Sequence, residues 1–245
     1  MRMITRSAAL AAALLVSASA VQAQEHVYNL QGSFADSLGG PSLVGNFASL
    51  QSDGYNFGPG SPLSLSNVFT SPVYSVILRL RLNNPVGNYA KIVDFKNRTT
   101  DNGYYSDASA TPDFYDGTNE ILGLPAAYTP QASRLTALTR DATGLFTVYV
   151  NGIMQLQFTD TAGDAIFNAV NNIAYFGTDE VGGFDQGTGR IRTVAVFDLA
   201  LTQQQVLDYE LGIRITATPE PATLTLLATG LLGVFGAARR RRKVA

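Results

Sequence analysis

The 245-residue chain has no cysteine, no tryptophan and one histidine. Without cysteine it has no disulfide, no thiol nucleophile and no cysteine-ligated zinc. A histidine-dependent catalytic triad would have to use His26, which we expect instead to be a partly exposed residue of the first strand. The absence of tryptophan counts against a strong saccharide site, because its large apolar ring is a good stacking surface.

Positive charge is scarce between the two ends of the chain. Residues 24–217 contain ten Lys or Arg and eighteen Asp or Glu, which gives a net charge of about −8. An acidic domain repels phosphate backbones, so the composition argues against nucleic acid as a partner. This segment is long enough for one domain with a sizeable core.

The N-terminus has the pattern of a secretory signal peptide. Arg2 and Arg6 give a positive start, residues 8–16 are apolar, and Val21-Gln22-Ala23 fits a small-residue cleavage site. We predict a signal peptide at residues 1–23, recognised by the Sec export machinery. An uncleaved anchor is the alternative, but the apolar stretch is short for a membrane span.

The C-terminus combines three features. Thr218-Pro219-Glu220-Pro221 is followed by an uncharged apolar run, 222–238, and then by Arg239-Arg240-Arg241-Arg242-Lys243. At about 1.5 Å per helical residue the run reaches roughly 25 Å, the short end of a transmembrane helix. The prolines disfavour helix before residue 222, and the basic cluster is costly to move across a bilayer.

This tail, residues 218–245, resembles the PEP-CTERM sorting signal of exosortase substrates in Gram-negative bacteria. The matching residues are Pro219, Glu220, Pro221, the apolar helix and Arg239, Arg240, Arg241 and Arg242. Thr218 departs from the Val that often precedes the motif. The resemblance implies transient or stable anchoring in the inner membrane, recognition by an exosortase, and delivery to the cell surface or an extracellular polysaccharide matrix. An unprocessed C-terminal anchor is the alternative.

Between the two ends, the pattern of apolar residues predicts mostly β-strands. Apolar residues alternate over 74–82, and again over 146–150 and 154–158 on either side of Asn151-Gly152, a strong hairpin signal. One helix is well signalled, because Thr202 and Gln205 fit a capping box and Gly212 can close the helix. Many short strands separated by turn residues predict an all-β, antiparallel jelly-roll sandwich. Further strands are predicted at 26–30, 62–66, 90–95, 134–139, 173–176 and 191–197.

Several stretches in order resemble the laminin G-like, concanavalin A-like jelly-roll domains. They include Arg140-Asp141, Tyr149-Val150-Asn151-Gly152 and Phe197-Asp198-Leu199-Ala200-Leu201-Thr202, and the resemblance covers nearly all of 26–214. It implies one domain at 24–217 that binds glycans or proteins, often with calcium on one rim. A minority of that family are glycoside hydrolases.

The catalytic pattern of those hydrolases is absent. They place their carboxylates on one strand as Glu-X-Asp-X-Glu, because alternate residues of a strand share a face. Asp179 and Glu180 are adjacent, so on a strand they would point to opposite faces. The sequence therefore predicts a non-enzymatic domain, with a polysaccharide-cleaving enzyme as the alternative.

Two acidic regions are candidate calcium sites, because calcium prefers loop carboxylates and carbonyls. Asp101-Asn102 is followed by Asp107, Asp113 and Asp116, and Asp179-Glu180 is followed by Asp185. The proposed ligands are Asp101, Asp179, Glu180 and Asp185. Neither region has EF-hand spacing, and solvated turns that favour Asp and Asn are the alternative.

A second candidate site is aromatic. Four tyrosines and Phe114 fall in a loop-rich stretch, where we expect the tyrosines to stack on sugar rings. The residues are Tyr104, Tyr105, Tyr115 and Tyr128. The alternative is that several of them cover the edge of the core.

The sequence as a whole predicts an exported adhesion, matrix or glycan-binding protein with no certain cofactor. A structural matrix component without a specific ligand is the other alternative.

Overall fold

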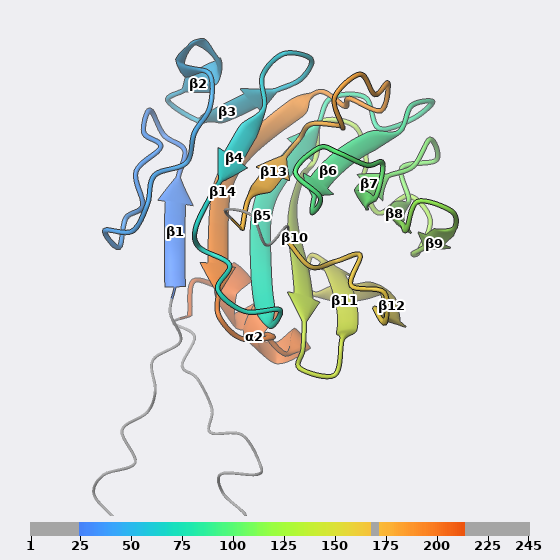
Figure 1. The fold of residues 1–245 in the computed structure, drawn as a ribbon. Helices are drawn as coiled ribbons and strands as arrows, with labels where there is room; N and C mark the ends of the chain where they lie inside the picture. Colours follow the sequence, from blue (N-terminus) through green and yellow to red (C-terminus); the bar gives the residue numbers. More distant parts are fainter. Residues whose placement is uncertain (1–24, 168–171, 214–245) are drawn as a thin grey trace, which may run out of the picture. The chain divides into compact units, whose positions relative to one another are not determined.

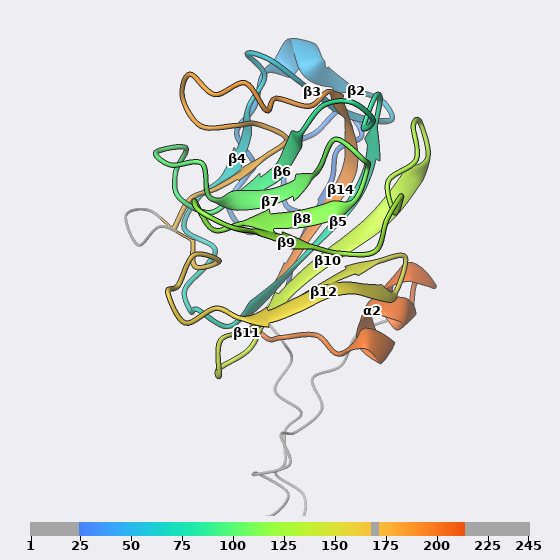
Figure 2. The same cartoon turned by 90° about the vertical axis from the view of Figure 1, so that its right-hand side faces the viewer.

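The computed structural model describes residues 25–167 and 172–213, which form two antiparallel sheets packed face to face (Figures 1 and 2). The predicted signal peptide and the predicted sorting tail lie outside the described residues. Among the residues that are described, no helix is both long enough and apolar enough to cross a membrane.

The larger sheet, sheet A, has eight strands. They are β1 (Glu25–Asn29), β2 (Leu50–Gln51), β3 (Gly54–Phe57), β5 (Tyr74–Leu82), β10 (Ser133–Arg140), β11 (Leu145–Val150), β12 (Ile153–Thr159) and β14 (Gly189–Phe197). Their order is β12-β11-β10-β5-β14-β3-β2, and β1 also pairs with β14. The short 3₁₀ helix η1 (Phe47–Ser49) precedes β2.

The smaller sheet, sheet B, has six strands. They are β4 (Leu63–Leu65), β6 (Ala90–Asp94), β7 (Gly103–Ser106), β8 (Pro112–Tyr115), β9 (Glu120–Leu122) and β13 (Ala174–Phe176), in the order β4-β13-β6-β7-β8-β9. The predicted all-β antiparallel sandwich of the jelly-roll type is therefore confirmed.

The main core lies between the two sheets. On β5, Val76, Leu78, Leu80 and Leu82 are buried and face sheet B, as the period of two predicts. The side chains of the alternate residues of β5 project from the opposite face of sheet A, which is its outer face. That outer face divides into an apolar half and a charged half.

The apolar half is covered by helix α2 (Gln203–Glu210). The predicted capping box is present, with the Thr202 hydroxyl accepting from the Gln205 amide and the Gln205 side chain accepting from the Thr202 amide. Val206 of the helix packs on a second apolar cluster that includes Ile77 and Phe197. This helix explains why β14 is buried on both faces near its end.

The Asn151-Gly152 hairpin is also confirmed. It joins β11 to β12, and both residues have positive φ, 49° and 73°. Glycine suits this turn because it adopts positive φ at little cost. Any Cβ at Gly152 would also collide with Leu207 of α2, so the turn and the helix constrain one another.

Strands β7, β8 and β9 differ from the sequence prediction, which treated this stretch as loop-rich. Each is only three or four residues long. Short strands of this kind carry little periodicity, and pairing fixes them instead: β7 pairs with β6, β8 with β7, and β9 with β8.

Candidate functional site

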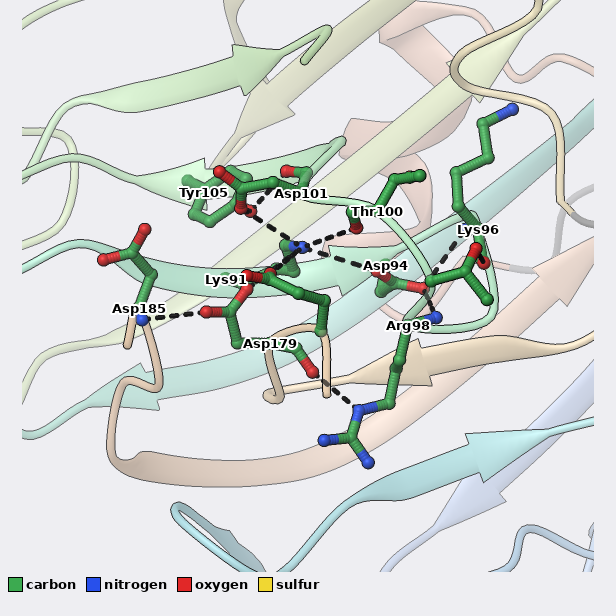
Figure 3. Close-up of polar contacts among 11 residues, drawn as sticks. Lys91, Asp94, Lys96, Arg98, Thr100, Asp101, Tyr105, Asp179 and Asp185 are labelled. Carbon is green, nitrogen blue, oxygen red and sulfur yellow. Dashed lines mark hydrogen bonds and ion pairs between the residues drawn. The ribbon is translucent and has the colours of Figure 1, made fainter. Parts of the chain in front are cut away.

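The two predicted acidic regions meet on the outer face of sheet B, around a lysine that the sequence did not single out (Figure 3). Lys91 lies on β6, and its side chain is fully buried. Its Nζ lies 3.0 Å from Asp179 Oδ1, 3.2 Å from Glu180 Oε2, 3.4 Å from Asp94 Oδ2 and 3.7 Å from Asp101 Oδ1. We call this set the Lys91 cluster.

Three elements position these side chains. Lys91 and Asp94 come from β6, Asp101 from the loop between β6 and β7, and Asp179 and Glu180 from the loop between β13 and β14. The Arg98 Nε donates to the Asp179 carbonyl at 2.6 Å, which ties the two loops together.

The backbone around the cluster is tightly fixed. Asp94 Oδ1 accepts from the amides of Lys96 and Arg98, at 3.1 and 2.8 Å. The Asp185 amide donates to Asp179 Oδ2 at 2.8 Å, and its carbonyl accepts from the Lys91 amide. A Cβ at Gly183 would collide with the carboxylates of Asp179 and Glu180, so any larger residue there would have to displace them.

Lys91 stays charged in this environment. Burial acts to lower its pKa, but Asp94, Asp179 and Glu180 act in the opposite direction, and the net effect is a raised pKa. The Tyr105 ring centroid lies 5.1 Å from the ammonium and adds a cation–π contact.

Asp179 and Glu180 divide their roles. A hydrogen bond to Asp179, followed by burial, raises the pKa of Glu180 to about 7. Burial acts to raise the pKa of Asp179, but hydrogen bonds from Glu180 and the Asp185 amide hold it below its ordinary value. Residues 179 and 180 lie in a loop rather than on a strand, so the period-two argument that would point them to opposite faces does not apply.

The carboxylates of this region offer calcium an incomplete set of oxygen ligands. Carboxylate oxygens of Asp101, Asp179 and Asp185 lie within 4.8 Å of one another. Calcium takes six to eight oxygen ligands, and three carboxylates supply only part of that shell. The Lys91 ammonium already contacts Asp101 and Asp179, and it supplies the positive charge that the calcium prediction assigned to a metal. Calcium binding stays a prediction.

The predicted tyrosine site is not formed as expected. The exposed fractions of Tyr104, Tyr105 and Tyr128 are 0%, 2% and 1%, so none of these rings offers a face to a sugar. The Tyr104 and Tyr128 hydroxyls lie 2.7 Å apart, and the Tyr105 hydroxyl donates to Asp101. Only Tyr115 is half-buried rather than buried. The error arises because Tyr104, Tyr105 and Tyr115 lie on the inner strands β7 and β8 of sheet B, and the Tyr128 hydroxyl is bonded to those of Tyr104 and Thr136.

The remaining acidic residues of the first region serve local structure. Asp107 and Asp116 accept backbone amides within their own turns, as turn chemistry alone would predict. Asp113 is buried on β8. The single histidine, expected to be partly exposed, is buried, and its Nδ1 lies 2.7 Å from Asp36 Oδ2.

Comparison with known proteins supports both resemblances. The family model of the concanavalin A-like lectin/glucanases superfamily matches residues 60–207, and that of the PEP-CTERM protein-sorting motif matches residues 217–242. No curated protein matches the chain. The domain limits predicted from the sequence stay predictions.

Solved structures share the fold at low identity. The binding domain of botulinum neurotoxin serotype D has a TM-score of 0.56 at 12% identity, with 78% of this chain and 52% of that chain covered. A botulinum neurotoxin type C structure, whose cell entry is described as dependent on two ganglioside molecules, has a TM-score of 0.57 at 11% identity over 79% and 52%. The binding domain of botulinum neurotoxin DC in complex with SialylT gives 0.56 at 12% over 79% and 51%. The chain spans about half the length of these structures, and the likeness concerns the fold alone.

Proposed function

This chain belongs to the concanavalin A-like lectin/glucanases superfamily, and on that basis we propose that it is a surface or matrix protein whose jelly-roll domain binds glycans. One observation carries the proposal: a lectin-like domain and a PEP-CTERM sorting motif occur in the same chain. The sorting motif fits export, anchoring in the inner membrane and processing by an exosortase. A polysaccharide at the cell surface is then the ligand nearest to the delivered domain.

The Lys91 cluster is the proposed contact surface. Its Asp101 and Glu180 side chains are 45% and 24% exposed, whereas the ammonium that fixes them is fully buried. Rigid carboxylates are good acceptors for sugar hydroxyls, because little side-chain entropy is lost when the ligand binds. When Glu180 is protonated, its proton is shared with Asp179, so toward a sugar hydroxyl Glu180 acts as an acceptor.

We propose that the domain is not an enzyme. The pKa values of Asp179 and Glu180 are driven in opposite directions, which is the arrangement that divides acid from nucleophile in some hydrolases. However, the two carboxyl groups are hydrogen-bonded to each other, whereas a retaining glycosidase holds its pair about 5 Å apart with the sugar between them. The Lys91 ammonium also forms ion pairs with both Asp179 and Glu180.

The test is capture of the producing cell's exopolysaccharide by the full chain in a neutral detergent, with calcium and with chelator. We expect binding by the wild type and a clear loss in E180Q and D101N. The matched control is D208N, which removes one exposed carboxylate from α2. Equal capture by E180Q, D101N and D208N would place the contact elsewhere.

Two further results would change the proposal. No capture in either condition would favour a protein ligand or a structural matrix component without a specific ligand. Release of reducing ends from the polysaccharide would establish the enzymatic alternative instead.

A further inference from the structure

The charged half of the outer face of sheet A carries four arginines in an otherwise acidic domain. Arg79 and Arg81 lie on β5, and Arg190 and Arg192 lie on β14, the neighbouring strand. Together they are four of the ten cations in residues 24–217. Helix α2 covers the apolar half of this face, and of the four arginines Arg192 is exposed and the others are half-buried.

Three of these arginines line one hollow of about 110 Å³. The other lining residues are Leu80, Gln131 and Ser133. Leu80 and Leu82 point into the core, so the side chain of Arg81 between them must project from the outer face of sheet A. The hollow therefore opens on the outer face of sheet A, whereas the Lys91 cluster lies on the outer face of sheet B.

The hollow places like charges opposite one another. Arg81 and Arg190 are directly paired in the antiparallel register of β5 and β14. Two side chains that are directly paired project from the same face, with their Cβ atoms about 5 Å apart. Like charges at that distance destabilise the sheet. Arg190 is partly compensated, because it pairs with Asp53 and its Nε donates to Asn56 Oδ1 at 2.9 Å.

Arg81 and Arg192 lack that compensation. Within residues 25–167 and 172–213, no carboxylate lies in ion-pair distance of either guanidinium. The Arg81 Nε is buried and has no acceptor among these residues. The buried Nε is out of reach of a ligand, so an acceptor from outside the domain meets half-buried Arg81 and exposed Arg192 at their terminal guanidinium nitrogens.

From this hollow we infer a second glycan subsite, which binds the carboxylate of an acidic, uronate-bearing polysaccharide. A guanidinium presents two parallel donors that match a carboxylate, and two such groups beside the Ser133 hydroxyl give charged and neutral donors together. The inference rests on the proposed glycan-binding function, but it uses different residues on the opposite sheet.

The test measures binding of the full chain, in neutral detergent, to four polymers. They are polygalacturonate, neutral dextran, dextran sulfate and polyglutamate. We expect binding to polygalacturonate that weakens as salt rises, and no binding to dextran. The R81Q/R192Q double variant should bind polygalacturonate at least tenfold more weakly. The control R134Q, which removes one cation from neighbouring β10, should stay within twofold.

A second readout separates ligand binding from a structural role. Without polymer, R81Q should melt at a higher temperature than the wild type, because the repulsion with Arg190 is relieved. Polygalacturonate should raise the melting temperature of the wild type but not of R81Q/R192Q.

Several outcomes would overturn the inference. Wild-type affinity in R81Q/R192Q would exclude the hollow. Preference for dextran sulfate would exclude the carboxylate, and preference for polyglutamate would point to an acidic peptide. The proposed function fails separately: loss of exopolysaccharide capture in E180Q with unchanged arginine variants would keep that function and reject this subsite.

Discussion

Buried Asp113 should make the stability of this domain fall as the pH rises. Its side chain is 1% exposed on β8, and its Oδ1 has no partner among the described residues. Burial, followed by the charges of Glu120 and Asp107, raises the pKa of Asp113 to about 7 from an ordinary 3.8. The folded state therefore keeps a proton that the unfolded state releases.

The sign and size follow from linkage. The stabilisation from the neutral carboxyl is complete below pH 3.8 and is lost as the pH rises to about 7. Each pH unit between these values corresponds to about 1.4 kcal/mol, so the total loss is about 4 kcal/mol. That is a large share of the roughly 5–15 kcal/mol that holds a typical domain folded.

The substitution D113N tests this reasoning, because an amide has the same shape as the neutral acid and cannot ionise. We expect the free energy of unfolding of D113N to exceed that of the wild type by about 3 kcal/mol more at pH 8 than at pH 4.5. Urea denaturation can be followed by tyrosine fluorescence, since the chain has eleven tyrosines and no tryptophan.

A control of opposite sign is available at the end of the same strand. Hydrogen bonds from the Asn119 amide and side chain lower the pKa of exposed Asp116, so any stability that it adds is lost as the pH falls. D116N should therefore not gain stability over the wild type at high pH. A stability difference between D113N and the wild type that stays constant from pH 4.5 to pH 8 would refute a raised pKa at Asp113.

Three other variants test separate parts of the molecule. K91M should lower the free energy of unfolding by about 3–5 kcal/mol, because it removes the buried ammonium and leaves the carboxylates of Asp94 and Asp179 unpaired. Millimolar calcium should raise the melting temperature of K91M more than that of the wild type, and equal shifts would contradict the view that Lys91 takes the role of the cation. T202A should cost about 1 kcal/mol in urea denaturation through loss of the α2 cap. Deletion of residues 218–245 should release the protein from the membrane fraction, and unchanged membrane association would reject the sorting tail.

Local signals in the sequence predicted the parts of the fold that depend on near neighbours. The alternation of 74–82, the Asn151-Gly152 turn and the Thr202–Gln205 capping box each reflect contacts within a few residues. Strands β7 to β9 were missed because three or four residues carry too little periodicity, and their order depends on successive pairing outward from β6. The tyrosines were misplaced for the same reason.

The candidate site shows a different limit. The sequence suggested Asp101, Asp179, Glu180 and Asp185 as two separate acidic regions. Lys91 joins them. In the sequence it looks like an ordinary solvent-exposed strand lysine, and only the structure shows that the β6–β7 and β13–β14 loops cover it. A lysine between apolar residues in a strand that is buried on both faces is the signal that would have found it.

The arginine hollow shows how much of a surface site a sequence can carry. Alternate residues of a strand share a face, so the sequence already places Arg79 and Arg81 together. The buried leucines that alternate with them show that this face is the outer one. The same argument applies to Arg190, which precedes buried Ile191, but Arg192 is the unpaired residue of an irregularity in β14, so only the structure places it beside the hollow. Only the pairing of β5 with β14 shows that the two arginine pairs share one surface, because that register joins residues more than a hundred positions apart. The register fixes the Cβ atoms of Arg81 and Arg190 as neighbours, and Arg190 already turns its guanidinium to Asp53 and Asn56, so an external anion at the hollow would act on Arg81 and Arg192.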